Sequence, residues 1–284
     1  MSVNRAVYEK RIVAFVDVLG FKTMIEDSET DTALRHKIKR AMEIIRKSAS
    51  ESWGERVVST FSDSAVISYK LSQSSLFYLL IDIIHLQINL GALGIMIRGG
   101  IAIGDCYHDG NVIFGPAMNE AYRLEKIEAM WPRVVILSDT LKKGIVETVD
   151  RNPYGVEYDI EEIKSCLKQD AYNDEEDNPK LFFVDFLRQP QEIIEFGDEY
   201  YNWLRDFRVA IVQGLNRYSP KNDELEMSQA DANKVFKKYR WIMNYWNNVV
   251  EDDSAVMPVP DIDKKDEFRE RYKKLRIRKR YPYV

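Results

Sequence analysis

Two aspartates, Asp17 and Asp63, are the residues of this chain that most directly suggest chemistry. Asp17 follows the apolar run Ile12–Val16, and Asp63 stands between the strand-like runs Val57–Phe61 and Ala65–Tyr69. Two carboxylates on neighbouring buried strands would repel each other unless a cation lay between them. Such a pair suits Mg²⁺ or Mn²⁺ when substrate phosphates supply the remaining ligands. The pattern predicts a metal-dependent phosphoryl-transfer enzyme, and the alternative is that each aspartate only forms a turn or caps a helix.

A glycine after the first strand and a polar pair on a later helix extend this hypothesis. Gly20 lies where the predicted strand gives way to a helix, so the backbone can approach a phosphate and the helix N-terminus can bind its oxygens. Asn119 and Arg123 are four residues apart and share one helix face. Together they can orient a ribose and neutralise charge on a phosphoryl group. The alternative is a solvated face on which Arg123 pairs with Glu120 or Glu125.

Composition limits the other classes of protein. The 284 residues carry a net charge of −5, which does not favour nucleic acid as a partner. The three histidines are widely spaced, so no zinc site is predicted. Two cysteines and the absence of a secretory signal predict a reduced, cytoplasmic setting. The apolar stretch Leu76–Leu90 is interrupted by polar residues, which predicts a mostly buried helix rather than a membrane span.

The hydrophobic pattern predicts an α+β domain over residues 1–190 and a helical extension over residues 191–284. Aromatic residues at helical spacing in the extension predict a core or an interface rather than a ligand cage, and basic residues gather near its end. The predicted strands are Ile12–Val18, a hairpin over Val57–Tyr69, Ile95–Gly104 with Cys106–Phe114 as its hairpin partner, Arg133–Leu137 and Lys180–Leu187. The predicted helices are Phe21–Ile25, Thr30–Ser48, Ser74–Leu90, Gly115–Met130, one capped by Ser138-Asp139-Thr140, Glu195–Leu215 and Gln229–Val250.

Four segments of the chain resemble the motifs of class III nucleotidyl cyclases, in the same order and with similar spacing over residues 10–185. Phe15–Phe21 resembles the first metal-binding motif of that family, and Phe61–Ser64 resembles the second. Arg98–Gly104 resembles its Arg-x-Gly-Ile-x-x-Gly strand, and Gly115–Glu125 resembles the helix that carries its transition-state Asn and Arg. The resemblance implies a ferredoxin-like cyclase fold with a central, mostly antiparallel sheet. It also implies a head-to-tail homodimer with two sites at the interface.

The resemblance further implies a reaction and a role for each residue. Asp17, the Val18 carbonyl and Asp63 of one subunit would hold two Mg²⁺ or Mn²⁺ ions on a nucleoside triphosphate. Asn119 and Arg123 would come from the other subunit. The ribose 3′-hydroxyl would attack the α-phosphate and expel pyrophosphate. Further substrate contacts are implied for Leu19, Gly20, Phe21 and Lys180.

Two positions differ from the purine cyclases of this family. Where those enzymes read the base with charged side chains, this chain carries Ser59 and Val112, and each polar edge of a purine buried unpaired costs about 1–3 kcal/mol. The pattern resembles the bacterial Pycsar cyclases, which make cyclic UMP or cyclic CMP on phage infection and activate a separate effector protein. We expect UTP as the substrate ahead of CTP. The alternatives are a purine nucleotide cyclase, a non-catalytic cyclase-homology module that dimerises, and another palm-type nucleotidyltransferase.

Overall fold

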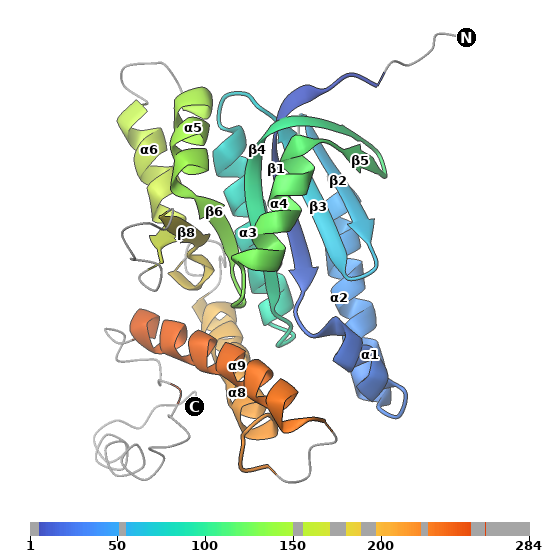
Figure 1. The fold of residues 1–284 in the computed structure, drawn as a ribbon. Helices are drawn as coiled ribbons and strands as arrows, with labels where there is room; N and C mark the ends of the chain where they lie inside the picture. Colours follow the sequence, from blue (N-terminus) through green and yellow to red (C-terminus); the bar gives the residue numbers. More distant parts are fainter. Residues whose placement is uncertain are drawn as a thin grey trace. The chain divides into compact units, whose positions relative to one another are not determined.

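The computed structural model describes residues 6–50, 55–149, 156–170, 180–188, 197–222, 227–250 and 259. The chain falls into two compact units, one built on Met1–Gly91 and Ile95–Gln189 and the other on Ala92–Gly94 and Pro190–Val284 (Figure 1). Residues 171–179, and residues 269–280 with the basic side chains near the end of the extension, lie outside the described residues.

The first unit has an α+β fold with a central, mostly antiparallel sheet, as predicted. Its strand order is β2-β3-β1-β4-β6-β8-β7, and β5 pairs with β4 alone. Among the described strands, only β4 and β6 pair in parallel. The succession of strand, helix, two strands, helix and strand, with β1 and β3 inside, is the ferredoxin-like arrangement. The strands are β1 (Glu9–Val18), β2 (Arg56–Phe61), β3 (Ser64–Lys70), β4 (Ile97–Asp109), β5 (Val112–Phe114), β6 (Val134–Leu137), β7 (Leu167–Gln169) and β8 (Leu181–Val184).

Helices cover both faces of this sheet (Figure 1). On one face α4 packs against β1 and β4, and the core there includes Val13, Phe15 and Ala102 from the strands with Ala117 and Ala121 from the helix. Because successive side chains along a strand point to opposite faces, the residues of β1 that alternate with Val13 and Phe15 point to the other face. On that face α3 packs against β1 and β3. The helices are α1 (Phe21–Ser28), α2 (Thr32–Ser50), α3 (Ser75–Gly91), α4 (Pro116–Ile127), α5 (Ser138–Thr148) and α6 (Val156–Ser165), followed by the 3₁₀ turn η2 (Phe186–Arg188).

The apolar helix α3 is mostly buried, as predicted from its sequence. Leu76, Leu79, Leu80, Ile83 and Ile84 are fully buried within it. None of the described helices combines the length and the apolar content that crossing a bilayer requires.

A glycine sets the distance between α4 and the sheet. A Cβ atom at Gly100 in β4 would lie 2.4 Å from the carbonyl oxygen of Ala121 and 2.5 Å from Cβ of Leu124. Only a residue without a side chain lets the backbone of the helix approach the strand this closely. Gly100 therefore determines how near the side chains of α4 lie to those of β1 and β4.

Three local predictions were wrong. The expected break in β4 near Asp105 is absent, because Cys106 continues the pairing with Glu9 of β1 and Lys10 forms an ion pair with Asp105 at 2.9 Å. The return strand is accordingly short, Val112–Phe114. Ser138 does not cap α5 but is its first residue, with Leu137 at the cap position. The sequence interpretation also missed α6 and β7, whose local patterns are short and polar.

In the described residues of the second unit, two helices, α8 (Gly197–Arg217) and α9 (Gln229–Val250), pack on each other. Trp203 stacks on Phe207 at 5.2 Å between ring centroids, and Phe207 lies 5.9 Å from the ring of Trp246. Phe236, Trp241, Tyr245 and Trp246 of α9 are buried. Their burial agrees with the prediction that these aromatic residues pack in a core or an interface.

Candidate functional site

Asp17 and Asp63 come together at one end of the sheet. Asp17 is near the end of β1, and Asp63 lies in the two-residue turn between β2 and β3. The backbone N–H of Val18 donates to the carbonyl oxygen of Asp63 at 3.1 Å, which fixes the turn against β1. Ser64 Oγ donates to Asp17 Oδ1 at 3.0 Å.

The electrostatics of Asp17 fit a cation site. Burial raises the pKa of the Asp17 carboxyl, and the neighbouring Asp63 raises it further through its charge and a side-chain hydrogen bond, while Ser64 and Arg98 oppose the shift. A divalent ion between the two carboxylates would offset the negative charge of Asp63 that disfavours the ionised form of Asp17. No group of three or more His, Cys, Asp or Glu side chains that could hold a metal occurs among the described residues. The pair would therefore depend on backbone, water or substrate oxygens for its other ligands.

The chain next to Asp17 presents backbone donors. Leu19 N–H donates to the carbonyl oxygen of Met96 at 2.8 Å, which leads the chain from β1 into the turn. Gly20 has φ of 76°, in the left-handed region that favours glycine, and α1 begins at Phe21 without a side-chain cap. The first N–H groups of α1 have no partner within the helix, so this N-terminus can receive an anion.

Arg98 and Glu125 are charged residues of the site that the sequence interpretation did not select. Ser64, Asp17 and Arg98 form one row across β3, β1 and β4, because Asp17 is paired directly with each of the other two. Arg98 Nη2 lies 3.6 Å from Asp17 Oδ2 and 2.7 Å from Glu125 Oε1 on α4. A charged residue at the start of an apolar strand was the signal available in the sequence, and the strand register was needed to place it.

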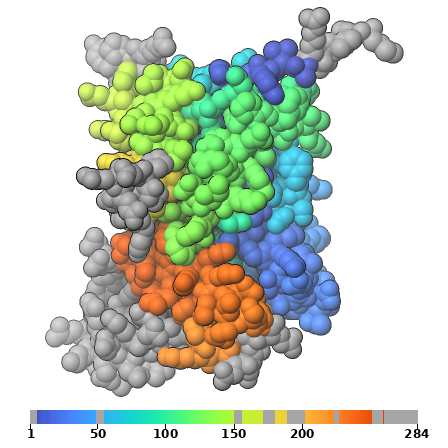
Figure 2. All heavy atoms as spheres, viewed as in Figure 1, coloured from blue at the N-terminus to red at the C-terminus, as the bar shows by residue number. Residues whose placement is uncertain are grey.

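Asn119 and Arg123 lie on a different side of α4 from Glu125. Residues two positions apart in a helix lie about 200° apart around its axis. Arg123 therefore points away from the sheet when Glu125 points toward it. Glu125 is buried and Asn119 is exposed, and Figure 2 shows α4 at the surface of the first unit. Arg123 Nε and Nη2 donate to the two carboxylate oxygens of Glu120 at 2.8 Å, which lowers the pKa of Glu120.

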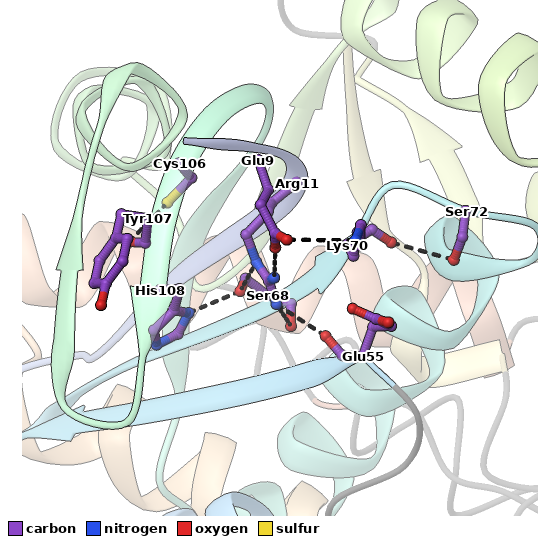
Figure 3. A network of polar contacts seen from close by, with 9 residues as sticks. All are labelled: Glu9, Arg11, Glu55, Ser68, Lys70, Ser72, Cys106, Tyr107 and His108. Carbon is purple, nitrogen blue, oxygen red and sulfur yellow. Dashed lines mark hydrogen bonds and ion pairs between the residues drawn. The ribbon is translucent and has the colours of Figure 1, made fainter. Parts of the chain in front are cut away.

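Ser59 lies inside a buried polar network and not at the surface. Its hydroxyl donates to the carbonyl oxygen of Gly110 at 2.6 Å and lies 2.8 Å from His108 Nε2. His108 Nδ1 is 2.7 Å from Ser68 Oγ, which accepts a hydrogen bond from Arg11 Nε at 2.9 Å (Figure 3). Since Ser68 uses its proton toward His108 and Ser59 uses its proton toward Gly110, the network assigns the His108 proton to Nε2. Burial, with Arg11 nearby, lowers the pKa of His108 to about 4.

The structure does not bring the remaining candidates to the aspartate pair. Val112 is exposed on β5, in the hairpin that follows His108. Lys180 precedes β8, and its carbonyl accepts from Ser138 N–H at 2.8 Å. Because β8 is antiparallel to β6, and β6 is parallel to β4, Lys180 lies toward the end of the sheet opposite Asp17.

Comparisons with known proteins give structural likeness only. The sequence matches no protein-family model and no curated protein. The fold is similar to the crystal structure of the adenylyl cyclase CyaB from P. aeruginosa, with a TM-score of 0.43 and 17% identity over 62% of this chain and 94% of that chain. It is also similar to a bacterial light-regulated adenylyl cyclase, with a TM-score of 0.39 and 15% identity over 65% of this chain and 54%, about half, of that chain. An adenylate/guanylate cyclase/hydrolase from Silicibacter pomeroyi gives a TM-score of 0.35 and 18% identity over 62% of this chain and 98% of that chain. Likeness at these values carries no functional argument, so function has to come from the residues of the site.

Proposed function

We propose that this chain is a nucleotidyl cyclase that converts a pyrimidine nucleoside triphosphate, UTP ahead of CTP, into a 3′,5′-cyclic monophosphate and pyrophosphate. The observation that carries the proposal is the adjacent carboxylate pair of Asp17 and Asp63 beside the uncapped N-terminus of α1. This arrangement offers negative charge for divalent cations and backbone donors for phosphate oxygens within one turn of chain. A structural turn alone does not require a second carboxylate whose charge disfavours the ionised form of Asp17.

Each residue of the site would have a separate role in the reaction. Asp17, Asp63 and the Val18 carbonyl would hold Mg²⁺ or Mn²⁺, which supplies activation of the attacking hydroxyl and neutralisation of the leaving pyrophosphate. Gly20 and Phe21 would contact the phosphates through the start of α1, whereas the Leu19 N–H is already bonded to Met96, so any contact from Leu19 would have to come from its other atoms. Asn119 would orient the ribose, and Arg123 would neutralise charge that develops on the α-phosphate.

The direction of α4 supports a homodimer. Arg123 and Asn119 do not point toward Asp17 of their own chain, because Glu125 occupies that side of the helix. A second copy is therefore needed to place an Asn119–Arg123 pair over each carboxylate pair. A two-fold arrangement repeats this exchange and gives two sites.

The pyrimidine preference rests on the sequence, which carries the neutral residues Ser59 and Val112 where the purine cyclases it resembles carry base-reading side chains. The Ser59 hydroxyl is committed to Gly110 and His108, and Val112 offers only apolar surface. Neither side chain has a charge to pair with the polar edge of a purine. We further propose that the product is a signal that activates a separate effector protein in defence against phage, which couples the two proteins without direct contact.

The direct test is to incubate the purified protein with ATP, GTP, CTP and UTP separately in Mn²⁺ and to identify the products by mass spectrometry. The proposal expects cyclic UMP, or cyclic CMP, as the main product. The matched controls Asp17→Asn and Asp63→Asn should form none. Cyclic AMP or cyclic GMP would keep the chemistry and overturn the base preference.

Failure to form any product would favour the non-catalytic alternative. One observation supports that alternative. Arg123 and Glu120 form a bidentate ion pair, in which Glu120 of the same helix accepts two of the hydrogen bonds that the guanidinium can donate. Where product does form, Glu120→Gln tests this ion pair, because releasing Arg123 should change turnover while nucleotide binding and the dimer stay as they were.

A further inference from the structure

Arg98 lies between two carboxylates, that of Asp17 in the aspartate pair and that of Glu125 on α4. Arg98 Nη2 is 2.7 Å from Glu125 Oε1 but 3.6 Å from Asp17 Oδ2. Arg98 Nε is buried and makes no hydrogen bond within the described part of the chain. No anchor is therefore visible on that edge of the guanidinium, and the two carboxylates compete for its outer nitrogen.

The packing of α4 gives Glu125 the advantage in this competition. Glu125 is only 3% exposed, and a buried carboxylate is costly unless a cation neutralises it. Gly100 lies two residues after Arg98 on the same face of β4, and a Cβ there would be 2.9 Å from the backbone nitrogen of Glu125. The close approach of the helix thus brings Glu125 onto Arg98.

We propose that Glu125 is a positioning residue, which holds the Arg98 guanidinium away from Asp17 so that the Asp17 carboxylate stays available to a divalent cation. The inference rests on the proposed function, because it takes Asp17 and Asp63 as the residues that bind the ion. Arg98 and the cation are both positive and compete for one carboxylate. By pairing with Arg98, Glu125 weakens the competition of Arg98 with the cation for Asp17.

The proposal predicts that substitutions at Glu125 and Arg98 change the Mn²⁺ affinity in opposite directions. Glu125→Gln leaves Arg98 free to move onto Asp17, so Mn²⁺ affinity should fall by about fivefold. Arg98→Gln removes the competing charge, so Mn²⁺ affinity should rise by a similar factor. In the double variant Arg98→Gln/Glu125→Gln, the Glu125 substitution should have no further effect, because the residue through which it acts is gone. A purely structural role would lower affinity in all three variants.

The measurement is a titration of the full-length protein with Mn²⁺ in the absence of nucleotide, in which the free ion is followed by electron paramagnetic resonance. Asp17→Asn defines the part of the binding that belongs to this site. Glu120→Gln is the matched control, since it neutralises a carboxylate of the same helix that contacts Arg123 and not Arg98. Its Mn²⁺ affinity should equal that of the unsubstituted chain.

The outcomes separate the inference from the function on which it rests. If Asp17→Asn removes Mn²⁺ binding and Glu125→Gln weakens it only while Arg98 is present, the inference is supported. If Asp17→Asn removes binding but Glu125→Gln leaves it unchanged, the inference is wrong and the metal site stands. If the unsubstituted chain binds no Mn²⁺ through Asp17, both are wrong. Where Glu125→Gln does not fold, as judged by circular dichroism, Glu125→Asp withdraws the carboxylate from Arg98 and should weaken binding in the same direction.

Discussion

At the scale of single residues, Asp17 carries a charge that the metal-free fold disfavours. Burial and the charge of Asp63 raise the pKa of its carboxyl above the ordinary value. The folded state therefore binds a proton more tightly than the unfolded chain, and this residue makes the metal-free protein less stable as pH rises through that raised pKa. Such destabilised groups are typical of functional sites.

Asp17→Asn should separate stability from activity. The amide keeps the shape and an oxygen to accept from Ser64, but it removes the repulsion from Asp63. We expect the metal-free variant to melt at a higher temperature than the unsubstituted chain at pH 7, by a few degrees, and to form no product. Mn²⁺ should raise the melting temperature of the unsubstituted chain only. A lower melting temperature for the variant would show that the charge of Asp17 stabilises the fold.

His108 makes the opposite kind of contribution, because the fold needs it neutral. Its Nδ1 accepts from Ser68, so a proton added there would set two donors against each other beside the Arg11 charge. The pKa is lowered from 6.5 to about 4, and stability should therefore fall as pH drops from 6.5 to 4, by at most about 3 kcal/mol.

His108→Gln tests this pH dependence. Glutamine cannot titrate, so the difference in unfolding free energy between the variant and the unsubstituted chain should shrink between pH 6.5 and pH 4. Urea unfolding at a series of pH values measures it. His85→Gln is the control, since it removes an exposed imidazole from α3. Parallel profiles for His108→Gln and the unsubstituted chain would contradict the prediction.

At the scale of elements, the contact between α4 and β4 decides whether the site can form. Gly100→Ala would place a methyl group 2.4 Å from the backbone of α4, whereas the same change at Gly104 meets its nearest neighbour, Ala117, at an ordinary 3.6 Å. We expect Gly100→Ala to destabilise the protein by about 1–3 kcal/mol and to reduce turnover, because Glu125 and Arg123 move with the helix. Gly104→Ala should change neither. Equal effects from the two substitutions, in urea unfolding and product formation, would show that close approach of α4 is not required.

The sequence predicted the elements well wherever local pattern determines them. The hairpin turn at Ser62-Asp63 and the helix Gln229–Val250 follow from turn chemistry and from helical spacing. The length of β4 could not be predicted locally, because Asp105 and Cys106 are held in the sheet by pairing with Lys10 and Glu9, almost a hundred residues earlier. The same limit applies to the site, where strand register alone places Arg98 beside Asp17. The burial of Ser59 likewise depends on a distant hairpin that carries His108 and Gly110.

At the scale of the whole molecule, the proposal requires that each active site be shared between two copies of the chain. Asp17 and Arg123 would then belong to different sites although they lie in the same protomer. A protomer without Asp17 inactivates the site to which it contributes its aspartates. A protomer without Arg123 inactivates the site to which it contributes its arginine. In a mixed dimer of the two, both defects fall in the same site. This consequence distinguishes a shared site from one that is complete within a single chain.

Mixing Asp17→Asn with Arg123→Ala should therefore restore activity that neither variant has alone. In a mixed dimer both substitutions fall in one site, and the other site is intact. Random exchange between equal amounts makes half of the dimers mixed, so we expect about a quarter of the unsubstituted activity. Product formation after denaturation and refolding of the mixture measures it, with each variant refolded alone as the control. Mixing Asp17→Asn with Asp63→Asn should restore nothing if the two aspartates act in one site, because every mixed dimer then carries a defect in both. Activity from that second mixture would place Asp17 and Asp63 in different sites and overturn the metal pair itself.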